Sequence, residues 1–229
     1  MKINNTAFRG LFCPVITPFD EELKPDKKRF IQQCNRVLDN GCHGLAVFGT
    51  TGEANSLSVE ERMMLLDAII DAGIDASVIL PGTGCAALTD SVRLTRHAIQ
   101  LGCHSVLMLP PFYYKNVSVD GLFTTFTEII ERVSEECLNI YLYHIPSVTG
   151  VPFDLTLVER FIDKYPNTVV GLKDSSGVWT YTESLLKSRP GFAVFSVSEE
   201  FLRNNLSAGG CGTITATANV DASVIRAAY

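Results

Sequence analysis

The residues best suited to chemistry lie at the ends of apolar, strand-like runs. Lys173 ends such a run in TVVGLKDSSG (168–177), and an aspartate and two serines follow it. Lysine is among the residue types least often buried, so Lys173 is either a surface residue paired with Asp174 or a deliberately placed amine. A lysine desolvated at this place would lose affinity for its proton, and a neutral amine can attack a carbonyl carbon. On this stretch alone, the surface ion pair is the simpler interpretation.

Three other segments carry groups that could act with such an amine. Tyr143 ends the run 139–143, where a phenol could transfer protons or could be a core aromatic with a partner for its hydroxyl. Thr50 and Thr51 lie in the turn FGTTGE, where hydroxyls and backbone N–H groups can hold a carboxylate or serve the turn itself. Tyr114 lies in the segment PPFYYK, which is either a binding loop or a packed loop.

The chain that must position these residues alternates short apolar runs with helical patterns. Each run is β-branched or aromatic, which is typical of a strand buried on both faces. Alternating strands and helices predict a parallel sheet, and eight units favour a (β/α)8 TIM barrel over an open doubly wound sheet. Active sites of such barrels lie at the carboxyl ends of the strands, so the residues above should meet at one rim. The eight predicted strands cover residues 11–16, 44–48, 77–80, 105–109, 139–143, 168–172, 192–197 and 212–216.

Composition narrows the class of protein. The 229 residues are 46% apolar and 19% charged, and no linker or low-complexity segment divides them, so we expect one barrel domain over residues 1–229. A net charge of −6 without a basic patch argues against a nucleic-acid partner. No apolar run approaches the ~20 residues of a membrane span, and the N-terminus has no signal-peptide core. Seven scattered cysteines without a C-x-x-C pair predict reduced thiols and a cytoplasmic protein.

Zinc and phosphate sites are disfavoured by position. A zinc site needs converging ligands, but His43 and His104 precede strands and His97 lies within a helical pattern. Only His144 falls near the predicted rim. The glycine-rich segment SAGGCG precedes the eighth run, so it should end a helix rather than form a barrel phosphate site. We therefore expect no metal.

Several motifs in order give the chain a family likeness. From GLFCPVITPF through GTTGE, LSVEER, YHIPSVTG and GLKDSSG to GTITATANV, it resembles the class I pyruvate-dependent aldolases and lyases of the dihydrodipicolinate synthase and N-acetylneuraminate lyase family. The likeness spans nearly the whole chain and implies a TIM barrel. It is much less specific for an individual enzyme.

The resemblance implies a role for each matching residue. Lys173 matches the lysine that forms the family's Schiff base, and Tyr143 matches the tyrosine that transfers protons. Thr50 and Thr51 match the threonine pair that holds the pyruvate carboxylate and relays protons. Tyr114 matches the tyrosine that reaches into the neighbouring subunit's site, which implies a homo-oligomer, either a dimer or a tetramer. The implied substrate is pyruvate or a 2-keto acid, and no cofactor is implied.

Three positions depart from the family pattern. Val148 stands where dihydrodipicolinate synthase has an arginine that binds the second substrate's carboxylate, His144 replaces an asparagine, and Val197 replaces a glycine. A carboxylate beside Val148 would lose water without gaining a charged partner. A neutral, hydroxylated aldehyde from a 2-keto-3-deoxy sugar acid or a sialic acid therefore fits better. Synthase-type condensation and 2-keto-3-deoxy acid dehydration remain alternatives.

The C-terminal stretch raises a further expectation. Only NVDASVIRAAY follows the eighth run, so the last barrel helix and the family's C-terminal helical segment should be largely missing. A catalytically silent barrel with an assembly or regulatory role is the alternative from another class. Retention of the lysine, the tyrosine and the threonine pair argues against that alternative.

Overall fold

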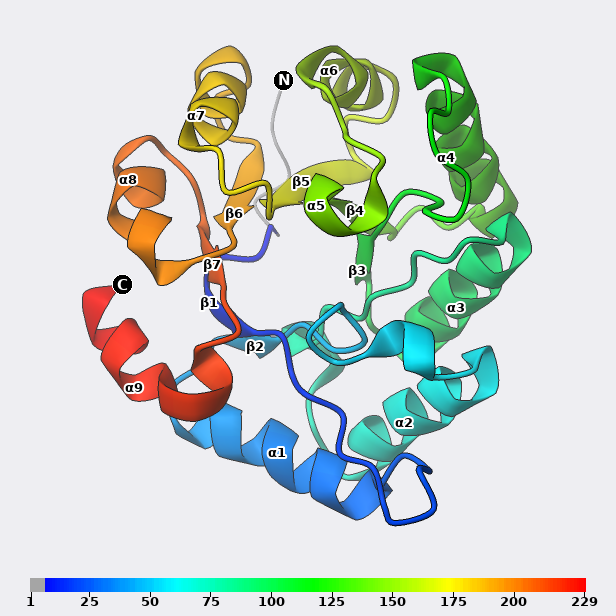
Figure 1. Ribbon diagram of the computed structural model, residues 1–229, viewed down its shortest axis with the longest axis vertical. Helices are drawn as coiled ribbons and strands as arrows, with labels where there is room; N and C mark the ends of the chain where they lie inside the picture. Colours follow the sequence, from blue (N-terminus) through cyan, green and yellow to red (C-terminus); the bar gives the residue numbers. More distant parts are fainter. Residues whose placement is uncertain (1–6) are drawn as a thin grey trace.

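The protein folds as an α/β structure with one curled parallel sheet. A computed structural model describes residues 7–229, and the first six residues of the expected domain lie outside the described residues. The strand order is β2-β1-β7-β6-β5-β4-β3, and all neighbouring strands are parallel. Figure 1 shows helices surrounding these strands, which is a TIM-barrel-like arrangement. The strands are β1 (Gly10–Cys13), β2 (Gly44–Leu45), β3 (Ser105–Met108), β4 (Asn139–His144), β5 (Val169–Asp174), β6 (Ala193–Ser196) and β7 (Gly212–Ile214).

Local capping signals define where several helices begin. Ser58 and Glu61 form a capping box at the start of α2, and Asp154 caps α6 by accepting from the backbone N–H of Leu157. Ser198 caps a short 3₁₀ turn, Glu199–Phe201, that precedes α8. The helices are α1 (Lys27–Asp39), α2 (Val59–Asp71), α3 (Leu88–Gln100), α4 (Val119–Val133), α5 (Pro146–Thr149), α6 (Leu155–Lys164), α7 (Trp179–Ser188), α8 (Leu202–Ser207) and α9 (Ala218–Ala228).

The third predicted strand is not a regular strand. Residues 76–78 form a 3₁₀ turn, and only single bridges at Ile79 and Gly82 connect the following segment to its neighbours. The backbone N–H of Leu80 donates to Leu45 at 2.7 Å, whereas Pro81 has no N–H and interrupts the ladder. The segment still joins β2 to β3, because its bridges reach Leu45 on one side and Leu107 on the other.

Two predicted strands end at different residues for local reasons. The second run was expected to continue to residue 48, but β2 ends at Leu45, and Phe48 adopts a left-handed φ of 57° that turns the chain towards the Thr50 turn. The sixth run was expected to end at residue 172, but β5 continues through Lys173 and Asp174. Lys173 is therefore a strand residue with a paired neighbour on each side, not a residue beyond a strand end.

The expectation that the last helix is largely missing is wrong. Helix α9 extends over 11 residues, with a break in helical geometry at Asp221 (φ −142°, ψ 82°). Ala222 and Ile225 are buried, and burial of this apolar face stabilises a helix that its short sequence alone would not support. Figure 1 shows α9 between α8 and α1 in the helical ring.

Two groups of buried side chains make up the interior. Tyr141, Tyr143, Phe12 and Phe195 belong to the group enclosed by the strands, and the rings of Phe12 and Phe195 meet edge to face at 5.4 Å. A larger group fills the layer between strands and helices. Alternate residues of one strand therefore face either the strand interior or the helices. The polar side chains of β4 and β5 are divided between these two sides in the same way.

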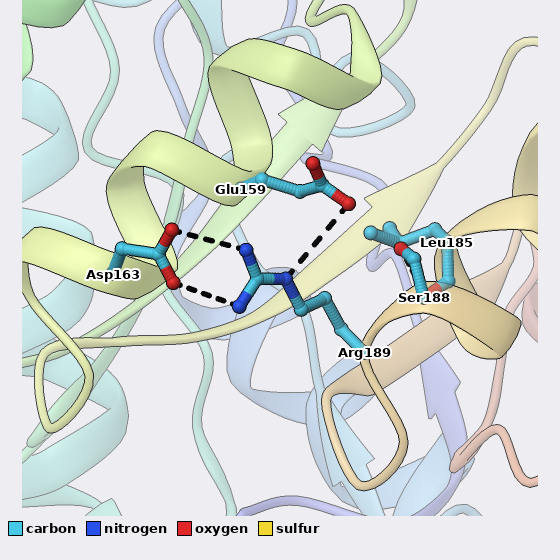
Figure 2. Close-up of polar contacts among 5 residues, drawn as sticks. All are labelled: Glu159, Asp163, Leu185, Ser188 and Arg189. Carbon is cyan, nitrogen blue, oxygen red and sulfur yellow. Dashed lines mark hydrogen bonds and ion pairs between the residues drawn. The ribbon is translucent and has the colours of Figure 1, made fainter.

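An arginine joins α6 to α7 at the outer surface. Figure 2 shows the Arg189 guanidinium between the two helices, with both terminal nitrogens on Asp163 at 2.7 and 3.1 Å. Its Nε lies 3.9 Å from Glu159. Arg189 is also the C-cap residue of α7, and its backbone N–H donates to the carbonyl of Leu185. The ion pair therefore fixes the C-terminal end of α7 against α6.

Candidate active site

A row of hydrogen-bonded groups from two adjacent strands and a turn forms the candidate active site. Lys173 on β5 lies in register with Tyr143 on β4. Lys173 Nζ donates to Tyr143 Oη at 3.3 Å, and Tyr143 Oη donates to Thr50 Oγ1 at 3.4 Å. The lysine and the tyrosine are each only 3% exposed, whereas Thr50 is exposed. The row thus leads from a buried amine to a hydroxyl that solvent or a ligand can reach.

The electrostatics of this row favour proton exchange. Burial acts to raise the pKa of the Tyr143 phenol, but the nearby Lys173 charge and hydrogen bonds with Thr50 and Lys173 outweigh it. The net result is a pKa below the usual value for tyrosine. Lys173 Nζ also lies 4.3 Å from the centre of the Tyr143 ring, so the amine meets both the face and the hydroxyl of the phenol.

The alternative of a Lys173–Asp174 ion pair does not fit the contacts of the aspartate. Asp174 is buried and accepts hydrogen bonds from the Ser176 backbone N–H at 2.9 Å and from the Thr182 hydroxyl at the start of α7. Within residues 7–229, no salt bridge joins Lys173 to Asp174. Strand alternation separates the two side chains, so the lysine faces the tyrosine and the aspartate faces the helices.

His144 lies on the helix side of β4 and is buried. Its Nδ1 accepts from the backbone N–H of Phe153 at 3.1 Å, and its ring stacks on Tyr181 with centroids 4.4 Å apart. Burial lowers the pKa of His144, although the nearby Asp174 charge opposes this shift. The histidine therefore supports the segment after β4 and does not join the Lys173 row.

The other four predicted site residues are not part of this hydrogen-bonded row among residues 7–229. Thr51 is half-buried in the turn beside Thr50, and Val197 is half-buried directly after β6. Tyr114 and Val148 are 76% and 57% exposed. In the part of the chain that the structure describes, none of the four makes a side-chain hydrogen bond to Lys173 or Tyr143.

Ser175 is a candidate site residue that the sequence analysis did not single out. Its hydroxyl is buried without a hydrogen-bond partner among residues 7–229. Its backbone N–H donates to the His144 carbonyl at 2.7 Å, which fixes its position beyond β5. Its place two residues after Lys173, on the same side of an extended chain, was the signal that could have identified it.

A small cavity adjoins the hydroxyl end of the row. It has a volume of about 10 Å³, which is close to the space that one water molecule needs. Thr50, Tyr143, Gly82 and Gly84 are among its lining residues. The glycines are needed here because a Cβ on Gly82 would lie 2.2 Å from the Phe48 carbonyl oxygen. The turn that carries Thr50 is thus packed closely against the segment after residue 79.

Groups of metal-ligating side chains and helices that could span a membrane were sought among residues 7–229. Residues 7–229 contain no group of three or more His, Cys, Asp or Glu side chains arranged to hold a metal ion. None of the helices that the structure describes is long and apolar enough to cross a membrane.

Comparison with known proteins gives one consistent family. The model of the dihydrodipicolinate synthetase family matches residues 7–229. An uncharacterized DapA-like lyase of Chloroflexus aurantiacus is 37% identical over 222 residues, which cover 96% of this chain and 74% of that protein.

Solved structures agree with the sequence match. The crystal structure of dihydrodipicolinate synthase from Agrobacterium tumefaciens superimposes with a TM-score of 0.92 at 37% identity, covering 95% of this chain and 76% of that one. YagE from E. coli, a prophage protein of the dihydrodipicolinic acid synthase family crystallised with pyruvate, has a TM-score of 0.86 at 27% identity, covering 96% and 74% of the two chains. The chain described here therefore belongs to the dihydrodipicolinate synthetase family.

Proposed function

We propose that this protein is a class I lyase or aldolase in which Lys173 forms a Schiff base with a 2-keto acid. The observation that carries the proposal is the hydrogen-bonded row of Lys173, Tyr143 and Thr50. A buried amine beside a phenol of lowered pKa suits a reaction that needs both a nucleophile and a proton carrier. Among residues 7–229, neither group forms an ion pair or a hydrogen bond with a carboxylate, so both are available to a substrate.

The proposed reaction begins with attack of neutral Lys173 Nζ on the C2 carbonyl. Loss of water gives an iminium, whose positive nitrogen accepts the electron pair released when the C3–C4 bond breaks. Tyr143 takes the proton from the hydroxyl that becomes the aldehyde, and Thr50 extends the proton path to the surface. Protonation of the enamine at C3 and hydrolysis of the iminium then release pyruvate and the free amine. Thr50 and Thr51 hold the carboxylate and so fix the geometry of attack.

A neutral, hydroxylated aldehyde is the proposed second product. YagE was crystallised with pyruvate, which supports pyruvate as the common half of the substrate. Val148 is exposed on α5 and offers no charge to a second carboxylate. Substrates of the 2-keto-3-deoxy sugar acid or sialic acid type fit these features better than aspartate semialdehyde does. Val197 is proposed to line the same pocket.

We also propose a homo-oligomer, a dimer or tetramer, in which Tyr114 meets the neighbouring subunit's site. Its exposure on the loop before α4 supports this arrangement. All seven cysteines are free thiols, which is the state expected in the reducing cytoplasm. A single (β/α)8 barrel domain remains our interpretation of the whole chain.

Reductive trapping tests the proposal. Incubation with pyruvate and borohydride should add the reduced adduct to Lys173, as located by mass spectrometry, and Lys173→Ala should abolish it. Lys187→Ala is the matched control, because Lys187 is exposed on α7 and forms a surface pair with Glu183. An adduct on another lysine, or none on the folded wild type, would contradict the proposal. A catalytically silent barrel would give no adduct on the folded wild type.

A substrate comparison then separates the alternatives. Cleavage of 2-keto-3-deoxy sugar acids and sialic acids, followed by pyruvate release, should exceed condensation of pyruvate with aspartate semialdehyde. Faster condensation would favour the synthase-type reaction, and a 2-keto product formed with loss of water would favour the dehydratase. Val148→Arg should shift the preference towards the semialdehyde if this position selects the second substrate.

A further inference from the structure

The loop between β3 and α4 presents two adjacent tyrosines with little packing of their own. Tyr113 and Tyr114 are 72% and 76% exposed. The centroids of their rings lie 5.1 Å apart with an interplanar angle of 88°, so the two side chains pack edge to face on each other. A segment with so few buried contacts opens easily unless polar contacts at its base hold it.

Lys115 supplies such contacts on both sides of the loop. Its Nζ donates to the carbonyl of Phe112, which directly precedes the tyrosines, and to the carbonyl of Thr149 at 2.6 Å. Thr149 is the last residue of α5 and lies 34 residues further along the chain. One ammonium group thus closes the base of the loop and ties it to a separate helix. Hydrogen bonds from a charged donor are stronger than those from a neutral one.

The end of α5 is shaped to receive this lysine. Gly150 has a left-handed φ of +63°, and a Cβ at this position would lie 3.1 Å from Lys115 Cδ. Thr149 is buried, and its hydroxyl contacts the carbonyls of Ile145 and Val151, both at 3.1 Å. The carbonyl that accepts from Lys115 therefore belongs to a fixed piece of backbone.

Helix α5 also follows directly from the strand that carries Tyr143. It begins at Pro146, two residues after β4 ends, and the Phe153 backbone N–H donates to His144 Nδ1. We propose that Lys115 is a positioning residue that clamps the tyrosine loop (residues 112–115) onto α5 and so keeps Tyr114 in the place that turnover requires. The part concerning turnover rests on the proposed function, whereas the clamp itself does not.

Limited proteolysis with chymotrypsin tests the clamp independently of activity. Chymotrypsin cleaves after Phe112, Tyr113 and Tyr114, and mass spectrometry identifies the cut. Lys115→Met should raise the rate of cleavage in this loop by about tenfold, because hydrogen bonds to a charged group are lost. Lys187→Met on α7, which removes a similar exposed lysine, should leave the rate unchanged. Equal rates in the wild type and Lys115→Met would overturn the clamp.

Gly150→Ala provides a second test of the same contact. Its new methyl group would displace the lysine stem, so cleavage in the loop should rise as it does for Lys115→Met. Both changes break one contact, and alanine at the left-handed φ of Gly150 also strains the backbone, so the double variant should be cleaved more slowly than the product of the two single effects predicts. Fully additive effects would show that Gly150 acts elsewhere and would overturn this account of the clamp.

Steady-state kinetics test the positioning role. Lys115→Met should lower kcat by roughly tenfold with little change in KM, and Lys115→Arg should restore most of kcat because a guanidinium can donate to both carbonyls. Borohydride trapping on Lys173 should persist in both variants. Faster cleavage with unchanged kcat would overturn the positioning role. Failure of trapping in the wild type would instead refute the proposed function, while the proteolysis would still decide the clamp.

Discussion

Lys173 and Asp174 are neighbours in sequence but belong to different environments. The lysine amine meets the Tyr143 phenol, whereas the aspartate is held by Ser176 and Thr182 on the helix side of β5. The period of two in a strand produces this separation. If the two side chains paired with each other, the amine would be held by a carboxylate and would not lie beside the phenol. At the residue scale, the direction of one side chain therefore decides which group the lysine meets.

Replacing Tyr143 by phenylalanine should separate binding from turnover. The variant should still form some imine on Lys173, but kcat should fall by about 10²–10⁴-fold because the proton carrier is lost. Tyr141→Phe is the matched control, since Tyr141 lies in the same strand interior and its hydroxyl accepts from the Phe8 backbone N–H at 2.6 Å. It should lower stability and leave kcat nearly unchanged. Equal losses of kcat in the two variants would show that Tyr143 is only a core residue.

His144 should make stability depend on pH. Burial lowers its pKa, so the unfolded chain, with a value of about 6.5, takes up a proton that the folded protein does not. The contribution of His144 to stability is therefore fully present above the unfolded pKa of about 6.5 and is lost as the pH falls towards the lower pKa of the folded protein. Between about pH 7.5 and 5.5 the wild type should lose more unfolding free energy than His144→Asn, measured by urea denaturation. Parallel pH curves would contradict this, because the other three histidines are common to both proteins.

At the element scale, the helices are joined to one another as well as to the sheet. Arg189 contacts both Asp163 and Glu159 of α6 while its backbone caps α7, as Figure 2 shows. Its two parallel bonds to one carboxylate make this pair more directional than a single lysine contact. The two helices follow β4 and β5 and flank the strands that carry Tyr143 and Lys173, so their relative position supports the candidate site.

Arg189→Ala should destabilise the protein modestly, by about 1 kcal/mol, because the pair is partly exposed and screened by solvent. Arg189→Lys should recover less than half of this loss, since lysine cannot form the two parallel bonds. Urea denaturation at low and high salt measures both effects, and salt should reduce the difference from the wild type. Lys187→Ala, which removes an ordinary surface pair with Glu183, serves as the control. A loss no greater than that of the control would show that the bidentate geometry adds nothing.

At the scale of the whole molecule, Tyr114 packs against Tyr113 of its own loop and is otherwise largely exposed. If it meets a neighbouring subunit, Tyr114→Ala should weaken self-association by at least about tenfold, since buried tyrosines are common energetic centres of interfaces. Sedimentation velocity over a range of concentrations would measure this. Val224→Ala on α9 removes a similarly exposed apolar residue and should have little effect. Unchanged association in Tyr114→Ala would remove the assembly role proposed for this tyrosine.

The sequence by itself determined the class of fold and the residues of the candidate row. Alternating apolar runs and helical patterns predicted a parallel α/β fold of the barrel type. These features could be predicted because they depend on hydrophobic periodicity, which is set by residues close together in the sequence. Lys173, Tyr143 and Thr50 were likewise identifiable, because each ends or follows an apolar run and matches a family motif in order.

Only the tertiary structure decided how these groups meet. Whether Lys173 pairs with Asp174 or with Tyr143 depends on the register between β4 and β5, which links residues 30 positions apart. The irregular segment around Pro81 and the burial that stabilises α9 also depend on distant partners. The contact of Lys115 with Thr149 joins a loop to the end of α5, and no sequence periodicity relates the two. Long-range packing and hydrogen bonding set these features, and their energies arise only when the whole ring of strands and helices has closed.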